Sequence, residues 1–105
     1  MQDGQDNSQR TPSEVCRALA ALSDLNRFRI VQLLAAGGQE FSAGAIAGAL
    51  GLSPSLISHH LSILESTGLV ERRRDGLWTF TRLRREEIAR HLATLQALVD
   101  ENSGG

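Results

Sequence analysis

The chain has 105 residues, 41% of them hydrophobic, and a formal net charge of −1, which fits one small globular domain with one core. Its one cysteine, Cys16, excludes a disulfide within the chain and a zinc site built from cysteines of one chain. No apolar run reaches the roughly 18 residues of a membrane span. The polar, acidic N-terminus carries no signal peptide, so we expect a cytoplasmic protein without membrane contacts.

Polar segments without periodicity stand at both ends of the chain. They predict a disordered N-terminal arm over residues 1–11 and a flexible tail over 102–105. Between them we find no linker and no internal repeat. The sequence therefore predicts one domain over residues 12–101.

Two amphipathic helices are predicted first, over about 11–23 and 25–38. Pro12 suits a helix start, Ser23 or Asp24 can cap the second helix, and Gly37-Gly38 can end it. The apolar stripes are Val15, Leu19 and Leu22 in the first helix, and Leu25, Phe28, Val31 and Leu34 in the second.

A helix-turn-helix is predicted next. After a brief strand at "QEF", Ser42 can cap a helix that ends at Gly51, because only glycine adopts the left-handed conformation cheaply. Ser53 and Pro54 then form a strong helix start, and the new helix spans 54–66. Two short helices joined by about three residues with a glycine are typical of this motif.

The helix 54–66 has one apolar and one small polar face. Ile57, Leu61 and Leu64 share the face that must point to the core. The opposite face suits the major groove of DNA, where short side chains let a helix approach the base edges. A plain solvated helix face is the alternative. The residues expected on the outer face are Ser55, Leu56, Ser58, His59 and Ser62.

The doubled histidine, His59-His60, does not favour a metal site. Adjacent helical residues point about 100° apart, so the two rings cannot easily share one ion. We expect His59 to face outward and His60 to be half-buried beside the core stripe.

A β-hairpin follows, with arms over about 69–74 and 77–83. Asp75-Gly76 suits a type I′ turn, whose two residues both need positive φ. Arg72, Arg73 and Arg74 precede the turn; two of them could contact phosphates or the minor groove, or all could form a solvated basic edge. We expect Trp78 and Phe80 to anchor the core.

The last helix is predicted over about 85–101, with an apolar stripe at Ile88, Leu92, Leu95 and Val99. The fold class is therefore mainly α with a small β-hairpin, a winged helix-turn-helix with one extra helix at each end. So small a core leaves apolar stripes over, so a homodimer through the first and last helices is expected. Its predicted interface is Val15, Cys16, Leu19, Leu92, Leu95 and Val99.

Charge is distributed unevenly along the chain. Residues 53–85 carry six arginines against three carboxylates, whereas residues 86–105 carry one arginine against four. Such asymmetry can place a basic surface on a nearly neutral protein. There is no lysine, and arginine suits the recognition of phosphates and bases, although codon bias would give the same composition.

The chain resembles the ArsR/SmtB family of bacterial winged-helix repressors. The similarity lies in "ALSDLNRFRIVQLL", in "LGLSPSLISHHLSILESTGLVERRRDG" and in "WTFTRL", and covers roughly residues 14–100. It implies a homodimer that represses transcription from an inverted-repeat operator. It also implies that 54–66 is the recognition helix and 70–82 the wing. The DNA-contacting residues are then Ser53, Ser55, Leu56, Ser58, His59, Ser62, Arg72, Arg73, Arg74 and Gly76.

The metal sites of that family are not matched. Ser42 and Gly44 stand where arsenic- and cadmium-type members have cysteines. Glu87 and His91, one helical turn apart, are weak candidates for a zinc-type site, but we expect them to be surface residues near the dimer seam. Cys16 could be a thiol sensor or an inert thiol.

The sequence thus predicts a dimeric, DNA-binding transcriptional regulator with no cofactor and an unknown inducer. Serines without a paired base and the absence of a glycine-rich phosphate loop exclude a familiar catalytic site, so we expect no enzyme. Two alternatives stay open: a metal- or thiol-sensing repressor, and a winged helix used for protein–protein contact.

Overall fold

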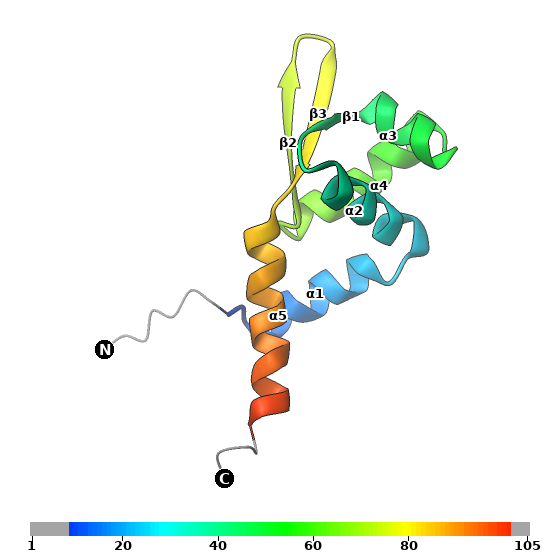
Figure 1. Ribbon diagram of the computed structural model, residues 1–105. Helices are drawn as coiled ribbons and strands as arrows, with labels where there is room; N and C mark the ends of the chain where they lie inside the picture. Colours follow the sequence, from blue (N-terminus) through cyan, green and yellow to red (C-terminus); the bar gives the residue numbers. More distant parts are fainter. Residues whose placement is uncertain (1–8, 102–105) are drawn as a thin grey trace.

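The computed structural model describes residues 9–101 and contains five helices and a small sheet in that range (Figure 1). Residues 1–8 of the arm expected over 1–11, and the tail expected over 102–105, lie outside the described residues. None of the described helices is long and apolar enough to cross a membrane. The elements are α1 (Pro12–Leu22), α2 (Leu25–Gly37), β1 (Phe41–Ser42), α3 (Ala43–Leu50), α4 (Pro54–Ser66), β2 (Val70–Asp75), β3 (Trp78–Leu83) and α5 (Arg85–Asp100).

Side-chain caps set most of the helix starts. Thr11 and Glu14 form a capping box at α1, in which each side chain bonds the other residue's backbone N–H. Asp24 caps α2, Ser42 caps α3 and Ser53 caps α4, each through its side-chain oxygen. These caps confirm the predicted starts of α2, α3 and α4 and explain why each helix begins at that residue.

The helix-turn-helix is formed by α3 and α4. Gly51, with φ of 69°, ends α3 in the left-handed conformation, and Ser53 starts α4 two residues later. Leu52 donates its backbone N–H to the Ala47 carbonyl across the turn, at 3.1 Å. The short connection fixes the direction of α4 against α3 and confirms the predicted motif.

One hydrophobic core holds α2, α3, α4 and the base of the hairpin together. Its fully buried large side chains are Ile30, Leu34, Ile46, Ile57, Leu61, Leu64, Leu69 and Val70. The core face of α2 is therefore formed by Ile30, Val31 and Leu34. Leu25 and Phe28, which we placed on the same stripe, are 72% and 44% exposed, because they lie toward the edge of that stripe.

The sheet is antiparallel with strand order β1-β3-β2, and the β2–β3 hairpin projects away from the helices (Figure 1). β1 adds only two pairs, Phe41 with Thr81 and Ser42 with Phe80, so the outer half of the hairpin has no third strand. At the other end, α5 packs on α1 and carries its C-terminal half away from the core (Figure 1).

The predicted turn of the hairpin is wrong by one residue. Asp75 pairs with Trp78, so the two-residue loop is Gly76-Leu77. Only glycines have positive φ among the described residues, and Gly76 has φ of 63°. This excludes the type I′ turn and fits type II′, which requires glycine only at its first loop position.

Candidate nucleic-acid interface

The exposed face of α4 is the one predicted from the helical spacing. Ile57, Leu61 and Leu64 are 0%, 1% and 0% exposed, and they anchor the helix in the core. All five residues expected on the outer face are exposed, namely Ser55, Leu56, Ser58, His59 and Ser62; so is the cap residue Ser53. These six side chains are small or uncharged, so this face can approach a DNA groove closely, and the one carboxylate beside it, Glu65, is bonded by Arg72.

The two histidines of α4 separate as expected. His59 is exposed, whereas His60 is 5% exposed and its Nδ1 lies 3.3 Å from Arg27 Nη1. Arg27 donates its Nε–H to the Ala21 carbonyl at 2.7 Å, which fixes the guanidinium against α1. Burial lowers the pKa of His60 below its ordinary value. His60 thus links α4 to α1 and α2 and does not reach the outer surface.

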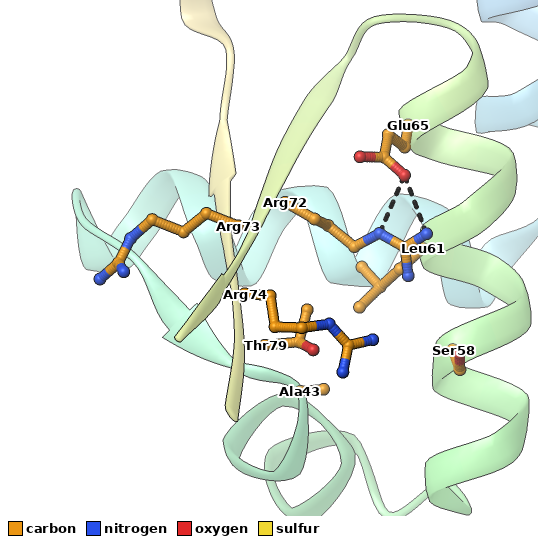
Figure 2. Close-up of a pocket in the computed structure, with 8 residues that line it drawn as sticks. All are labelled: Ala43, Ser58, Leu61, Glu65, Arg72, Arg73, Arg74 and Thr79. Carbon is orange, nitrogen blue, oxygen red and sulfur yellow. Dashed lines mark hydrogen bonds and ion pairs between the residues drawn. The ribbon is translucent and has the colours of Figure 1, made fainter. Parts of the chain in front are cut away.

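Successive arginines of β2 point to opposite faces of the hairpin, as the pleat requires. Arg72 and Arg74 lie on the face toward α4, and Arg73 extends to the other side (Figure 2). The three guanidinium groups therefore do not all face the same side of the hairpin.

Arg72 connects the hairpin to the recognition helix. Its Nε and Nη2 donate to Glu65 Oε1 at 3.0 and 2.8 Å (Figure 2). Its Nη2 also donates to Ser62 Oγ at 3.2 Å. Because Ser62 Oγ accepts from Arg72, its own hydrogen stays available for an acceptor on the outer face. Arg72 therefore positions a residue of α4.

Arg73 is held by Glu40, the residue before β1. Its Nε and Nη2 bond both carboxylate oxygens at 2.8 to 3.0 Å, and its guanidinium lies 4.8 Å from the centre of the Phe80 ring. The hydrogen bond from Arg73 lowers the pKa of Glu40, and the same bond raises the pKa of Arg73. Both side chains are partly exposed, at 52% for Arg73 and 32% for Glu40, so the pair is open to solvent.

Arg74 has no hydrogen-bond or ion-pair partner among residues 9–101. It lines a hollow of about 320 Å³ between the hairpin and the outer face of α4 (Figure 2). The other lining residues are Ala43, Ser58, Leu61, Glu65, Arg72, Arg73 and Thr79. One unpaired guanidinium thus stands beside the polar face of the recognition helix.

The tip of the hairpin is apolar. Leu77 is 100% exposed and Trp78 is 60% exposed. The expectation that Trp78 anchors the core is wrong, because it pairs with Asp75 at the last rung of the ladder, beyond the reach of the helices. Phe80, two residues nearer the core, is partly buried under Arg73.

Glu87 and His91 on α5 are not surface residues, contrary to the prediction. They are 3% and 8% exposed. Arg10 donates to both oxygens of Glu87, at 2.8 and 2.5 Å, and Arg90 donates to Oε2 at 2.7 Å. The Arg10 hydrogen bond lowers the pKa of Glu87 despite its burial. The carboxylate is therefore occupied by arginines, and no cluster of three metal-binding side chains occurs within residues 9–101.

Four of the six residues predicted for a dimer interface are exposed. Cys16, Leu19, Leu92 and Val99 lie at the surface of α1 and α5, and Leu95 is partly buried. Val15 differs, because it is 5% exposed and packs within its own chain. The buried face of α1 is instead made by Val15, Ala18 and Ala21.

Sequence reasoning missed three residues. Glu40 and Glu65 pair with arginines of the hairpin, and Arg10 pairs with Glu87 of α5. Each contacts a partner that is distant in the chain or on another element. The spacing of Glu65 and Arg72, seven residues apart across a turn, carries no local signal. The one local signal near Arg10 is the capping box of Thr11 and Glu14, which marks the start of α1 directly after Arg10.

Known proteins resemble this chain in the segment that contains the helix-turn-helix. A model described as "Bacterial regulatory protein, arsR family" matches residues 24–72, from the cap of α2 into β2. The HTH-type transcriptional regulator Rv0324 of Mycobacterium tuberculosis is 39% identical over 89 residues, which are 85% of this chain and 38% of the relative. The chain spans less than half the length of the curated relatives that it matches, 38% and 46%.

Solved structures share the fold over most of its length. An ArsR-like transcriptional regulator from Rhodococcus sp. RHA1 is 32% identical, with a TM-score of 0.75, over 85% of this chain and 82% of the other. The homodimeric winged helix-turn-helix DNA-binding domain of Mb0332 from Mycobacterium bovis is 38% identical, with a TM-score of 0.67, over 85% and 81%.

These similarities agree with the helix-turn-helix of α3 and α4 followed by the β2–β3 hairpin. The relatives are transcriptional regulators, a class without enzymatic activity, so the prediction of a non-enzyme is confirmed at the level of the family. The chain belongs to the ArsR family of bacterial regulatory proteins and has its winged helix-turn-helix DNA-binding fold.

Proposed function

We propose that the chain is a homodimeric repressor that binds an inverted-repeat operator through α4 and the hairpin. The observation that carries this proposal is that an exposed, small polar face on α4 and the unpaired side chain of Arg74 adjoin the same hollow, whose one carboxylate, Glu65, is bonded by Arg72. Base edges and phosphates need these two kinds of partner.

Dimerisation would bring two copies of α4 to successive turns of one DNA face, about 34 Å apart. Exposed leucines and valines on α1 and α5, together with the homodimeric state stated for the Mb0332 domain, support a dimer through these helices. Repression is the usual activity implied by the family resemblance.

A metal-sensing version at α5 is not favoured, because arginines already bond the oxygens of Glu87. Cys16 is exposed on α1, and no second cysteine exists in the chain to form a disulfide with it. A winged helix that binds another protein would not need a small polar face on α4 next to the unpaired side chain of Arg74.

The test is selection of bound duplexes from a random DNA pool, followed by fluorescence anisotropy at several salt concentrations. We expect log affinity to fall linearly with log salt and the selected sites to be inverted repeats. Ser58→Ala and His59→Ala should each change the preferred base at one position, by about 1–3 kcal/mol.

Ser13→Ala, at an exposed serine of α1, is the matched control and should leave the preference unchanged. The proposal fails if the protein selects no sequence at low salt. It also fails in its assignment of α4 if both α4 variants select the wild-type sites.

A further inference from the structure

The hairpin tip carries apolar surface that the fold does not use. Leu77 is 100% exposed and Trp78 is 60% exposed. Polar residues and glycine dominate two-residue turns, and Gly76 already supplies the positive φ that this turn needs. Burying one leucine contributes about 1.5–3 kcal/mol, so a fully solvated leucine at a turn leaves that much interaction available for a partner.

The tip continues the proposed DNA surface. Arg74 precedes it on the face toward α4, and Arg73 precedes it on the opposite face. β1 pairs with β3 only up to Phe80, so the last two residue pairs of the hairpin and its two-residue loop project freely. At about 3.3 Å per residue, the three residues of each arm make this free part roughly 10 Å long.

The dimensions of the DNA minor groove determine how much of the hairpin tip can enter it. That groove is about 6 Å wide and 7.5 Å deep, so it admits single side chains but not a two-stranded ribbon. With the tip at the groove mouth, the two faces of the ribbon turn toward the two bordering phosphate rows. Arg73 on one face and Arg74 on the other then match one row each.

We propose that Leu77 is an apolar wedge that enters the operator minor groove beside the half-site of α4, with Trp78 against the groove wall. This inference rests on the proposed function. Apolar side chains in the minor groove partly unstack a base step, which is easiest at flexible pyrimidine–purine steps. The wing therefore reads the deformability of a flanking step, in addition to the bases read by α4.

Trp78 makes the contact measurable. The chain has one tryptophan and no tyrosine, so its intrinsic emission reports the hairpin tip alone. We expect duplex DNA selected by the wild-type protein to quench this emission, with the same midpoint as the anisotropy of the labelled DNA. Quenching that depends on protein concentration without DNA would show contact with a second copy and overturn the proposal.

The second measurement compares Leu77→Ser with the wild-type protein and with Leu25→Ser. Leu25 is another exposed leucine, at 72%, and it begins α2, after the α1–α2 junction, which lies far from the hairpin (Figure 1). We expect Leu77→Ser to bind selected DNA about tenfold more weakly, equivalent to about 1.4 kcal/mol. It should keep the half-site sequence but lose the enrichment of pyrimidine–purine steps outside it.

The outcomes separate this inference from the proposed function. If the wild-type protein selects no DNA sequence, the proposed function fails and the wedge with it. If it selects sites but Leu77→Ser keeps wild-type affinity and flank preference, or Trp78 emission stays constant on binding, only the wedge is overturned. Equal losses in Leu77→Ser and Leu25→Ser would overturn it too, since the effect would not belong to the tip.

Discussion

Three consecutive arginines in β2 have three different environments. Arg72 bonds Glu65 and Ser62 on α4, Arg73 bonds Glu40 over the Phe80 ring, and Arg74 has no partner within residues 9–101. Because side chains alternate along a strand, Arg73 faces away from Arg72 and Arg74. Among residues 9–101, carboxylates lie within reach of Arg72 and Arg73 but not of Arg74. Equal residues in a basic run therefore have unequal access to phosphate.

The Glu40–Arg73 pair competes with any phosphate that Arg73 would bind. Glu40→Gln should raise DNA affinity a few-fold at most at low salt, since a solvent-exposed ion pair is weak and screened by salt. Fluorescence anisotropy with selected DNA checks this. Glu71→Gln removes the same charge from the exposed pair with Arg82 and is the control. An equal gain in both variants would indicate a general charge effect and contradict a specific competition.

Residue-level predictions succeeded where one helix decides the direction of a side chain. The 57/61/64 spacing fixed the buried face of α4, so the positions of His59 and His60 followed from sequence. They failed for Glu87 and Trp78. Glu87 is buried under Arg10, which lies 77 residues away in the chain, and Trp78 is exposed because the hairpin extends beyond the core. Neither cause is local.

At the level of elements, turn chemistry carried most of the information. Ser42, Gly51, Ser53 and Pro54 mark the helix-turn-helix without reference to the rest of the chain. The hairpin turn was displaced by one residue because Asp75-Gly76 and Gly76-Leu77 both contain the glycine that a tight turn needs. The pairing of Asp75 with Trp78 decides between them, and such register depends on packing along the whole hairpin.

Gly51 and Gly48 give opposite predictions within one helix-turn-helix. Neither would crowd an added Cβ, but only Gly51 has positive φ. Gly51→Ala should destabilise the domain by about 1–2 kcal/mol. Gly48→Ala, inside α3, should stabilise it by about 0.5–1 kcal/mol. Thermal unfolding should show shifts of opposite sign, about 4–8 °C per kcal/mol. A shift of the same sign in both would contradict the role of backbone conformation.

On the scale of the whole molecule, two buried histidines connect its parts. His60 lies between α4, α2 and α1, near Asp24, Arg27 and His59. His91 lies on α5 near Glu87, Arg10 and Glu14, and its ring nitrogens have no hydrogen-bond partner in the described chain. Burial lowers the pKa of both below 6.5, the ordinary value.

These lowered pKa values predict that stability decreases in mild acid. Below about pH 6.5 the unfolded chain binds protons more readily than the folded one, so stability is complete above that pH and is lost as pH falls toward the folded-state pKa values. The melting temperature should thus be lower at about pH 5.5 than at about pH 8. His60→Asn and His91→Gln should each reduce this difference. A melting temperature that stays constant or rises in acid would contradict the prediction.

The exposed apolar side chains of α1 and α5 lead to a prediction about assembly. Leu19, Leu92 and Val99 are 46%, 61% and 74% exposed, and α5 projects from the core with little of its own chain against it (Figure 1). A second copy would cover these side chains and would also set the spacing of the two α4 helices. Dimerisation and operator binding should therefore fail together.

Leu92→Asp should give a folded monomer, because Leu92 lies outside the core of its own chain. Loss of the second half-site contact should weaken operator binding by about 10²-fold or more, the usual gain from linking two binding modules. Sedimentation equilibrium and anisotropy measure the two effects. Leu25→Asp is the matched control, since Leu25 is 72% exposed but lies on α2. If Leu92→Asp remained dimeric, or bound a two-site operator as tightly as Leu25→Asp, the helices α1 and α5 would not form the interface that positions α4 on DNA.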